Sequence, residues 1–158
     1  MENGAIYDGG TYGGMAYYTN ESCYSTSHSS YTTGCKTEYA DSEVRYAVDA
    51  WAAAKFTDEL ETVDGYSARL LKLEELGNLG YEWGPTCATC SNGWIKTASV
   101  PSWVYSNNYW YWTMSQYNDY STNVWYVDEG GNVSTTYVNY NNGAVRPVIN
   151  VYKDKLPE

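Results

Sequence analysis

The sequence predicts a single α+β domain with two helices, a mostly antiparallel sheet and long loops. Between about residues 42 and 79, apolar side chains recur at the helical spacing. Short alternating runs separated by Gly, Asn and Asp follow in the second half, as in an antiparallel meander. The chain has 158 residues, a length that fits one domain spanning 1–158. We divide it into a Gly/Tyr/Ser-rich part (1–40), a helical part (41–80) and a strand-rich part (105–152).

The first helix is predicted from about Ser42 to Ala54. Asp41 or Ser42 can cap its beginning, because a short polar side chain accepts a hydrogen bond from the first helical turn. Apolar residues at spacings of three, four and seven give the helix one face directed to the core. Those residues are Val44, Ala47, Val48 and Trp51.

Ala68–Leu71 is predicted as a short strand that leads into a second helix, Leu73–Leu79, ended by Gly80. Another short strand is expected near Met15–Thr19. We predict a long loop over Tyr81–Ser102, where Cys, Pro and Trp each occur twice. The remaining predicted strands are Tyr109–Ser115, Val124–Asp128, Val133–Val138 and Ala144–Tyr152, with turns at 128–132 and 141–143.

The composition argues against two classes of binding partner, nucleic acids and the membrane interior. The chain carries 7 Trp and 19 Tyr but few Leu, Ile and Phe, which predicts an aromatic core and an aromatic contact surface. Its 9 basic residues against 19 acidic ones, a net charge of −10, argue against nucleic acid, since phosphates are bound by Lys and Arg. No apolar run approaches the ~20 residues that span a bilayer, so no membrane insertion is predicted.

The four cysteines are Cys23, Cys35, Cys87 and Cys90. Both pairs fall in predicted loops, and we interpret them as disulfides of an extracellular or cell-surface domain, with three full pairings open. Zinc is the alternative, because Cys87 and Cys90 have knuckle spacing, although Cys23 and Cys35 do not. The start, Met1–Gly4, has no signal-peptide pattern, so we expect any export signal or anchor to have been removed.

Four segments carry a resemblance to a known family: Ser42–Trp51, Tyr109–Ser115, Val124–Val127 and Gly143–Ile149 with its Arg-Pro pair. Together they resemble the C-type-lectin-like domains of gut bacterial surface proteins. The resemblance covers about residues 40–152 and implies a C-type-lectin-like fold. Related domains include the variable proteins of diversity-generating retroelements, whose binding face is rewritten through adenine-containing codons. From Tyr105 to Asn142, 26 of 38 residues are Tyr, Asn, Ser, Thr or Asp, which fits either a diversified face or ordinary turns and strands.

A ligand-binding or adhesion face is therefore predicted in the strand-rich part. Tyr and Trp give large contact areas, and Asn and Ser give adaptable hydrogen bonds. We expect its ligand to be a protein or glycan on another cell or surface, and leave the oligomeric state open. The predicted face residues are Tyr117, Asn118, Asp119, Tyr120, Asn123, Tyr126, Thr136, Tyr137, Asn139, Tyr140 and Asn141. The predicted scaffold residues are Val124, Val127, Val133, Val138, Val145 and Val148.

No cofactor is predicted. Gln116, Asn118 and Asp119 supply oxygen atoms of the kind that bind calcium. The Glu-Pro-Asn, Gln-Pro-Asp and Trp-Asn-Asp motifs of calcium-binding lectins are absent, so a plain turn is favoured over a calcium site.

The sequence does not predict an enzyme. The single histidine, His28, lies in a Ser-rich tract without an apolar strand to position it. A carbohydrate-active enzyme that uses Asp119, Asp128 or Glu129 remains an alternative, because paired carboxylates are recognised by their separation in space. A second alternative is a structural module of a larger surface protein or pilus. Arg146 is predicted to pair with an acid or with backbone carbonyls.

Overall fold

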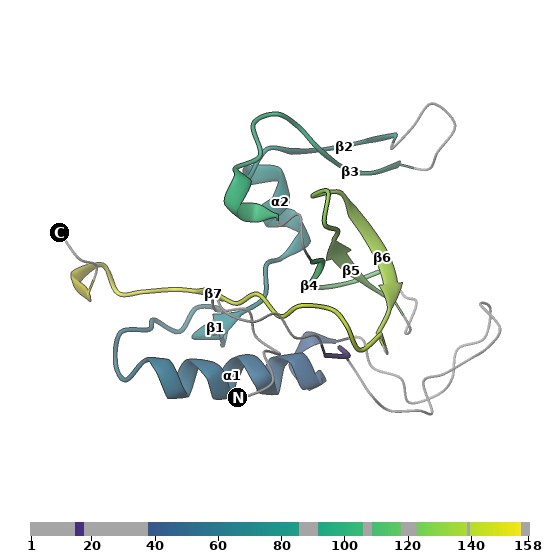
Figure 1. Ribbon diagram of the computed structural model, residues 1–158. Helices are drawn as coiled ribbons and strands as arrows, with labels where there is room; N and C mark the ends of the chain where they lie inside the picture. Colours follow the sequence, from purple (N-terminus) through teal and green to yellow (C-terminus); the bar gives the residue numbers. More distant parts are fainter. Residues whose placement is uncertain are drawn as a thin grey trace.

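The computed structural model of this chain describes residues 15–17, 38–85, 92–105, 109–117, 123–138 and 140–155. Within these ranges it is an α+β structure with antiparallel strand pairs (Figure 1). Its α-helices are α1 (Glu43–Lys55) and α2 (Leu73–Asn78). Its strands are β1 (Ala68–Arg69), β2 (Tyr81–Pro85), β3 (Asn92–Lys96), β4 (Tyr111–Gln116), β5 (Asn123–Val127), β6 (Val133–Tyr137) and β7 (Val148–Ile149). Short 3-10 helices span Tyr39–Asp41, Ser102–Val104 and Lys153–Lys155.

Helix α1 begins where the sequence predicts. The Ser42 hydroxyl accepts a 3.1 Å hydrogen bond from the backbone N–H of Arg45 and donates a 2.9 Å one to the carbonyl of Tyr39. Ser42 is fully buried, so both bonds form away from water. Val44 and Val48 point into the core from the same helix face. The predicted cap and core-facing side of this helix are confirmed.

Helix α2 is fixed by an ion pair with the preceding strand. The two terminal nitrogens of the Arg69 guanidinium donate to the Glu75 carboxylate, at 2.9 and 2.6 Å, and the Lys72 backbone N–H donates to it at 2.8 Å. Partial burial opposes ionisation of Glu75, but these hydrogen bonds prevail and hold its pKa below the ordinary value. The helix ends at Asn78, with Leu79 as its C-cap, and Gly80 follows with a φ of +95°, which suits glycine; its predicted place just after the helix is confirmed.

The main sheet has the order β4-β5-β6. All three strands were predicted, to within about two residues at each end. Asn123 lies opposite Tyr137, and Val127 lies opposite Val133. A register shift between Trp112 and Gln116 interrupts the pairing of β4 with β5, as at a β-bulge.

The prediction of a long loop over Tyr81–Ser102 is wrong. Strands β2 and β3 pair along five residues each, from Tyr81 opposite Lys96 to Pro85 opposite Asn92. Tyr81, Trp83 and Trp94 supply aromatic side chains that favour strands, and Lys96 donates a 2.6 Å hydrogen bond to the carbonyl of Gly130. The hairpin is therefore held to the main sheet through contacts distant in sequence.

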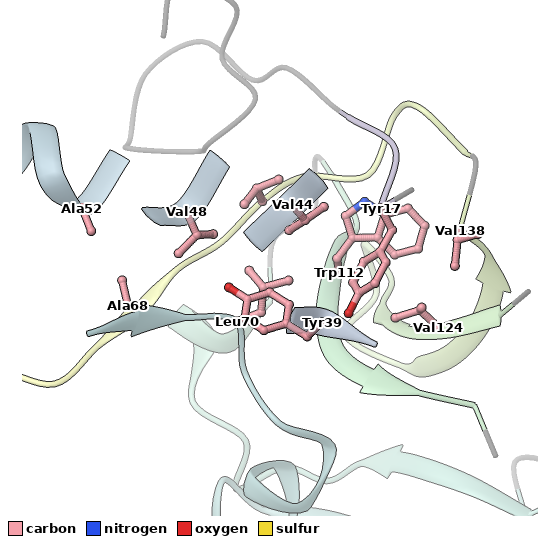
Figure 2. Close-up of a cluster of buried hydrophobic side chains, with 11 residues drawn as sticks. Tyr17, Tyr39, Val44, Val48, Ala52, Ala68, Leu70, Trp112, Val124 and Val138 are labelled. Carbon is pink, nitrogen blue, oxygen red and sulfur yellow. The ribbon is translucent and has the colours of Figure 1, made fainter. Parts of the chain in front are cut away.

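Hydrophobic side chains pack on both faces of the main sheet. One cluster joins the sheet to α1 and β1; Figure 2 shows most of it, including Tyr17, Val48, Leu70, Trp112 and Val124. The second cluster joins the opposite face to α2 and the β2–β3 hairpin. It contains Leu76, Tyr81, Val100, Val104, Tyr109, Tyr111, Trp125, Val127, Val133 and Ala144. Five of the predicted scaffold valines are buried, whereas Val148 is half-buried because β7 is paired only with the two-residue β1.

Residues after β6 return to the sheet. The Ala144 backbone N–H donates to the carbonyl of Trp110 at 2.9 Å, and its carbonyl accepts from Trp112 at 3.1 Å. Of the strand predicted near Met15–Thr19, only Met15 is paired, in an isolated bridge to Gly143. Ala16 and Tyr17 are not in a strand, and residues 18 and 19 lie outside the described residues. Among the residues described, we find no helix with the length and apolarity needed to cross a bilayer.

Candidate binding face

A row of polar and aromatic residues crosses one end of the main sheet. The Tyr117 backbone N–H donates a 3.0 Å hydrogen bond to the carbonyl of Asn123. Asn123 lies opposite Tyr137 across the β5–β6 pair. The rings of Tyr137 and Tyr140 lie 6.2 Å apart. We call Tyr117, Asn123, Tyr137 and Tyr140 the end row; all four were predicted face residues, and the fold brings them together.

Tryptophans extend the end row onto the β2–β3 hairpin. The Tyr117 ring lies 5.3 Å from that of Trp125, and Trp125 lies 6.4 Å from Trp83. Trp83 in turn lies 5.7 Å from Trp94, its partner across the hairpin. All three contacts are edge-to-face, an arrangement that aromatic rings favour. Trp83 is 54% exposed, whereas Trp125 is buried.

Trp83 was not among the predicted face residues. Its role depends on the hairpin, which the sequence analysis assigned to a loop. The local signal that could have found the strand is the pair of aromatic residues Tyr81 and Trp83, which are two positions apart and so lie on one face of a strand. The contact with Trp125 joins residues forty-two positions apart, and periodicity carries no information about such a contact.

Two predicted face residues lie on the other side of the sheet. Thr136 pairs with Val124, and side chains at successive strand positions point to opposite faces, so Thr136 cannot share a face with Tyr137. The ring of Tyr126 packs 5.0 Å from that of Trp110, against the cluster that contains α1. Burial raises the pKa of Tyr126, against a hydrogen bond with Ser134 that lowers it. The expectation that Tyr126 and Thr136 belong to the same exposed face as the end row is wrong.

The other predicted residues fall in two groups. Asn141 is exposed in the turn that follows Tyr140. Outside the described residues lie Asn118, Asp119, Tyr120, Asn139 and the four cysteines Cys23, Cys35, Cys87 and Cys90.

The described part of the face has no charged side chain. The end row, Trp83 and Trp125 are all neutral. Asp128 and Glu129 lie in the β5–β6 turn, at the opposite end of the strands from Asn123 and Tyr137. Asp128 accepts a 2.7 Å hydrogen bond from the backbone N–H of Asn132, as a turn residue does. Within the described ranges, no group of three His, Cys, Asp or Glu residues is placed to hold a metal ion.

A groove of about 330 Å³ lies elsewhere, between the last turns of α1 and the chain that leads to β1. Ala52, Leu60 and Ala68 contribute apolar surface to it. Two carboxylates also line it, and both are paired within the chain. Asp49 bonds to Arg45 at 2.9 Å, and Asp58 to Lys155 at 3.1 Å.

The chemistry of the face thus consists of an exposed indole beside tyrosine hydroxyls and an amide, on a framework packed from both sides. Such a surface can contact a ligand through rings and neutral hydrogen bonds. Comparison of the chain with known protein families, with curated proteins and with solved structures found no match.

Proposed function

We propose that this chain is a ligand-binding or adhesion domain displayed outside the cell, and that it binds a protein or glycan without catalysing a reaction. The observation that carries the proposal is the set of neutral residues, among those described, that runs from the end row over the buried Trp125 to the exposed Trp83. Tyr and Trp give large contact areas with few rotatable bonds, and Asn adapts its hydrogen bonds to the ligand.

The framework under this surface is suited to display. Trp125 is buried beneath Trp83 and Tyr117, and Val124 on the neighbouring position packs into the opposite cluster. A face fixed in this way loses little conformational entropy when a ligand binds. Rigid support below and polar aromatic groups above are the features expected of a binding module.

We further propose that the fold is C-type-lectin-like and that the face is diversified by a retroelement. The α+β arrangement, the antiparallel β4-β5-β6 sheet and the return of Ala144 to β4 support the first part. The second part is supported by the end row itself, which consists only of Tyr and Asn, residues favoured by adenine-directed mutagenesis.

The binding proposal is tested with one quadruple variant, in which Tyr117, Asn123, Tyr137 and Tyr140 are changed to alanine. Tyr46→Ala is the matched control, since Tyr46 is an exposed aromatic residue on α1, away from the face. Ligands are first selected with the wild-type domain from a glycan array and from a displayed library of folded protein domains. We expect the quadruple variant to lose the selected ligands and the control to keep them. Ligands that bind both variants equally would refute the proposal.

Diversification is tested separately, by sequencing codons 105–145 across a population of the source organism. Substitutions confined to adenine-containing codons of the face would support a diversified receptor. A uniform sequence would show a fixed face and refute this part alone.

A further inference from the structure

Trp83 is an exposed residue whose position is already fixed. Its ring is held edge-to-face between Trp94 and Trp125, at 5.7 and 6.4 Å. Trp94 lies in turn against α2, where an added Cβ on Gly77 would be 3.5 Å from its ring. The indole therefore has few alternative rotamers to lose on binding, while 54% of the residue remains open to solvent.

Among the described residues, those that join Trp83 to the end row are neutral and carry hydroxyl and amide groups. Tyr117 is in ring contact with Trp125, and Thr135 lies opposite Trp125 across the β5–β6 pair. Asn123 and Tyr137 follow one step further along the same face. A charged ligand would be desolvated here without an opposite charge among the described face residues, which is unfavourable. A net charge of −10 on the chain also disfavours acidic ligands.

A pyranose ring matches this chemistry. One side of such a ring presents several C–H bonds, which are attracted to the electron-rich face of an indole as the positive edge of another ring is. Its hydroxyl groups need neutral hydrogen-bonding partners around that contact. A protein partner would instead have to cover about 800 Å² of surface, and most rings of this face are already half-buried or buried against one another.

We propose, on the basis of the binding function above, that the ligand is a neutral glycan and that one of its pyranose rings stacks on Trp83. Trp83 then supplies the apolar contact, and the end row supplies the neutral rim. Since stacking requires no metal, binding will not change when a chelator is added.

The test uses the intact domain and an array of neutral, sialylated and sulfated oligosaccharides, with EDTA present and absent. The variants are Trp83→Ala and Trp83→Tyr. The control is Trp103→Ala, because Trp103 is equally exposed, at 59%, but lies on the 3-10 helix Ser102–Val104. We expect a neutral glycan to bind with and without EDTA, and Trp83→Ala to weaken it by about tenfold or more. Trp83→Tyr keeps an aromatic face and should weaken binding less than Trp83→Ala does. Trp103→Ala should stay within about threefold of wild type.

The failures of this inference and of the binding function are distinguishable. A neutral glycan that is lost in the quadruple end-row variant but binds Trp83→Ala and Trp83→Tyr normally would overturn the role of Trp83 and leave the binding function standing. Exclusive binding of acidic glycans, or of a protein lost in the end-row variant, would overturn the ligand class alone. Ligands insensitive to every substitution on the face would overturn both. Circular dichroism of Trp83→Ala checks its folding. If that variant unfolds, Trp83→Leu replaces it, because leucine keeps an apolar side chain without an aromatic face and should show the same loss of binding.

Discussion

The guanidinium of Arg146 donates a 2.8 Å hydrogen bond to the backbone carbonyl of Val104. A second nitrogen of the group contacts the carbonyl of Trp103, and its carbon atom lies 5.3 Å from the centre of the Tyr111 ring. One side chain thus joins the returning C-terminal segment to the 3-10 helix Ser102–Val104. The sequence-based expectation that Arg146 pairs with an acid or with backbone carbonyls is confirmed for the carbonyls.

Arg146→Met should lower the free energy of unfolding while binding of the folded protein changes little. The carbonyl of Val104, a fully buried residue, loses a charged donor, which typically costs about 1–3 kcal/mol. Urea denaturation gives the loss of stability, and titration of a ligand selected with the wild type gives the affinity. Lost binding at unchanged stability would contradict the assignment.

Gly143→Ala should destabilise the protein strongly. A Cβ at this position would lie 2.3 Å from Nε1 of Trp112, whose N–H donates a 2.9 Å hydrogen bond to the Met15 carbonyl. Overpacking of this kind costs about 1–3 kcal/mol or more. Gly77→Ala is the matched control, because its Cβ would find ordinary contacts and alanine favours a helix. Thermal melts should place the Gly143 variant well below wild type and the Gly77 variant at or above it.

The Arg69–Glu75 pair should contribute to acid sensitivity. Because the pKa of Glu75 is lowered in the folded state, its contribution is complete above the unfolded pKa and is lost as pH falls through the folded one. Denaturation curves between about pH 6 and about pH 3 should show a steeper loss for wild type than for Glu75→Gln. Glu74→Gln, on the exposed side of the same helix, should retain the wild-type slope.

Buried phenols should make the protein sensitive to alkali. Burial raises the pKa of Tyr111 and also that of Tyr17, while unfolded tyrosines ionise near pH 10. A raised folded pKa gives stability that is complete below pH ~10 and declines above it. Phenolate absorbance should therefore rise in two stages, the second coinciding with loss of the circular dichroism signal. A single stage completed in folded protein would contradict the burial.

Local sequence determined part of this structure. Helix α1 could be predicted because its cap, Ser42, and its core residues, Val44 and Val48, are close neighbours in the chain. The end row could be predicted because turn and strand residues alternate in short runs around it. Neither result required knowledge of contacts between distant segments.

Other features depend on packing between distant segments. Alternation separates Thr136 from Tyr137 but does not show that the α1 cluster covers one face of the sheet and the hairpin cluster the other. The place of Trp83 beside Trp125 likewise depends on a contact between segments that are distant in the sequence. Strand periodicity assigns side chains to two faces, and only the complete fold decides which of them is covered.

Packing on both faces of the main sheet limits where this chain can change without rearrangement. In the middle of β5, Val124 and Trp125 are buried in opposite clusters, so a new side chain at either position would disturb one of them. Tyr137 and Tyr140 lie where the strands end, and Tyr140 is 51% exposed. Among the described residues of this sheet, the positions open to change therefore lie where the strands end. Many different specificities could be carried there by one unchanged framework, whether natural selection or a designed library supplies the variants.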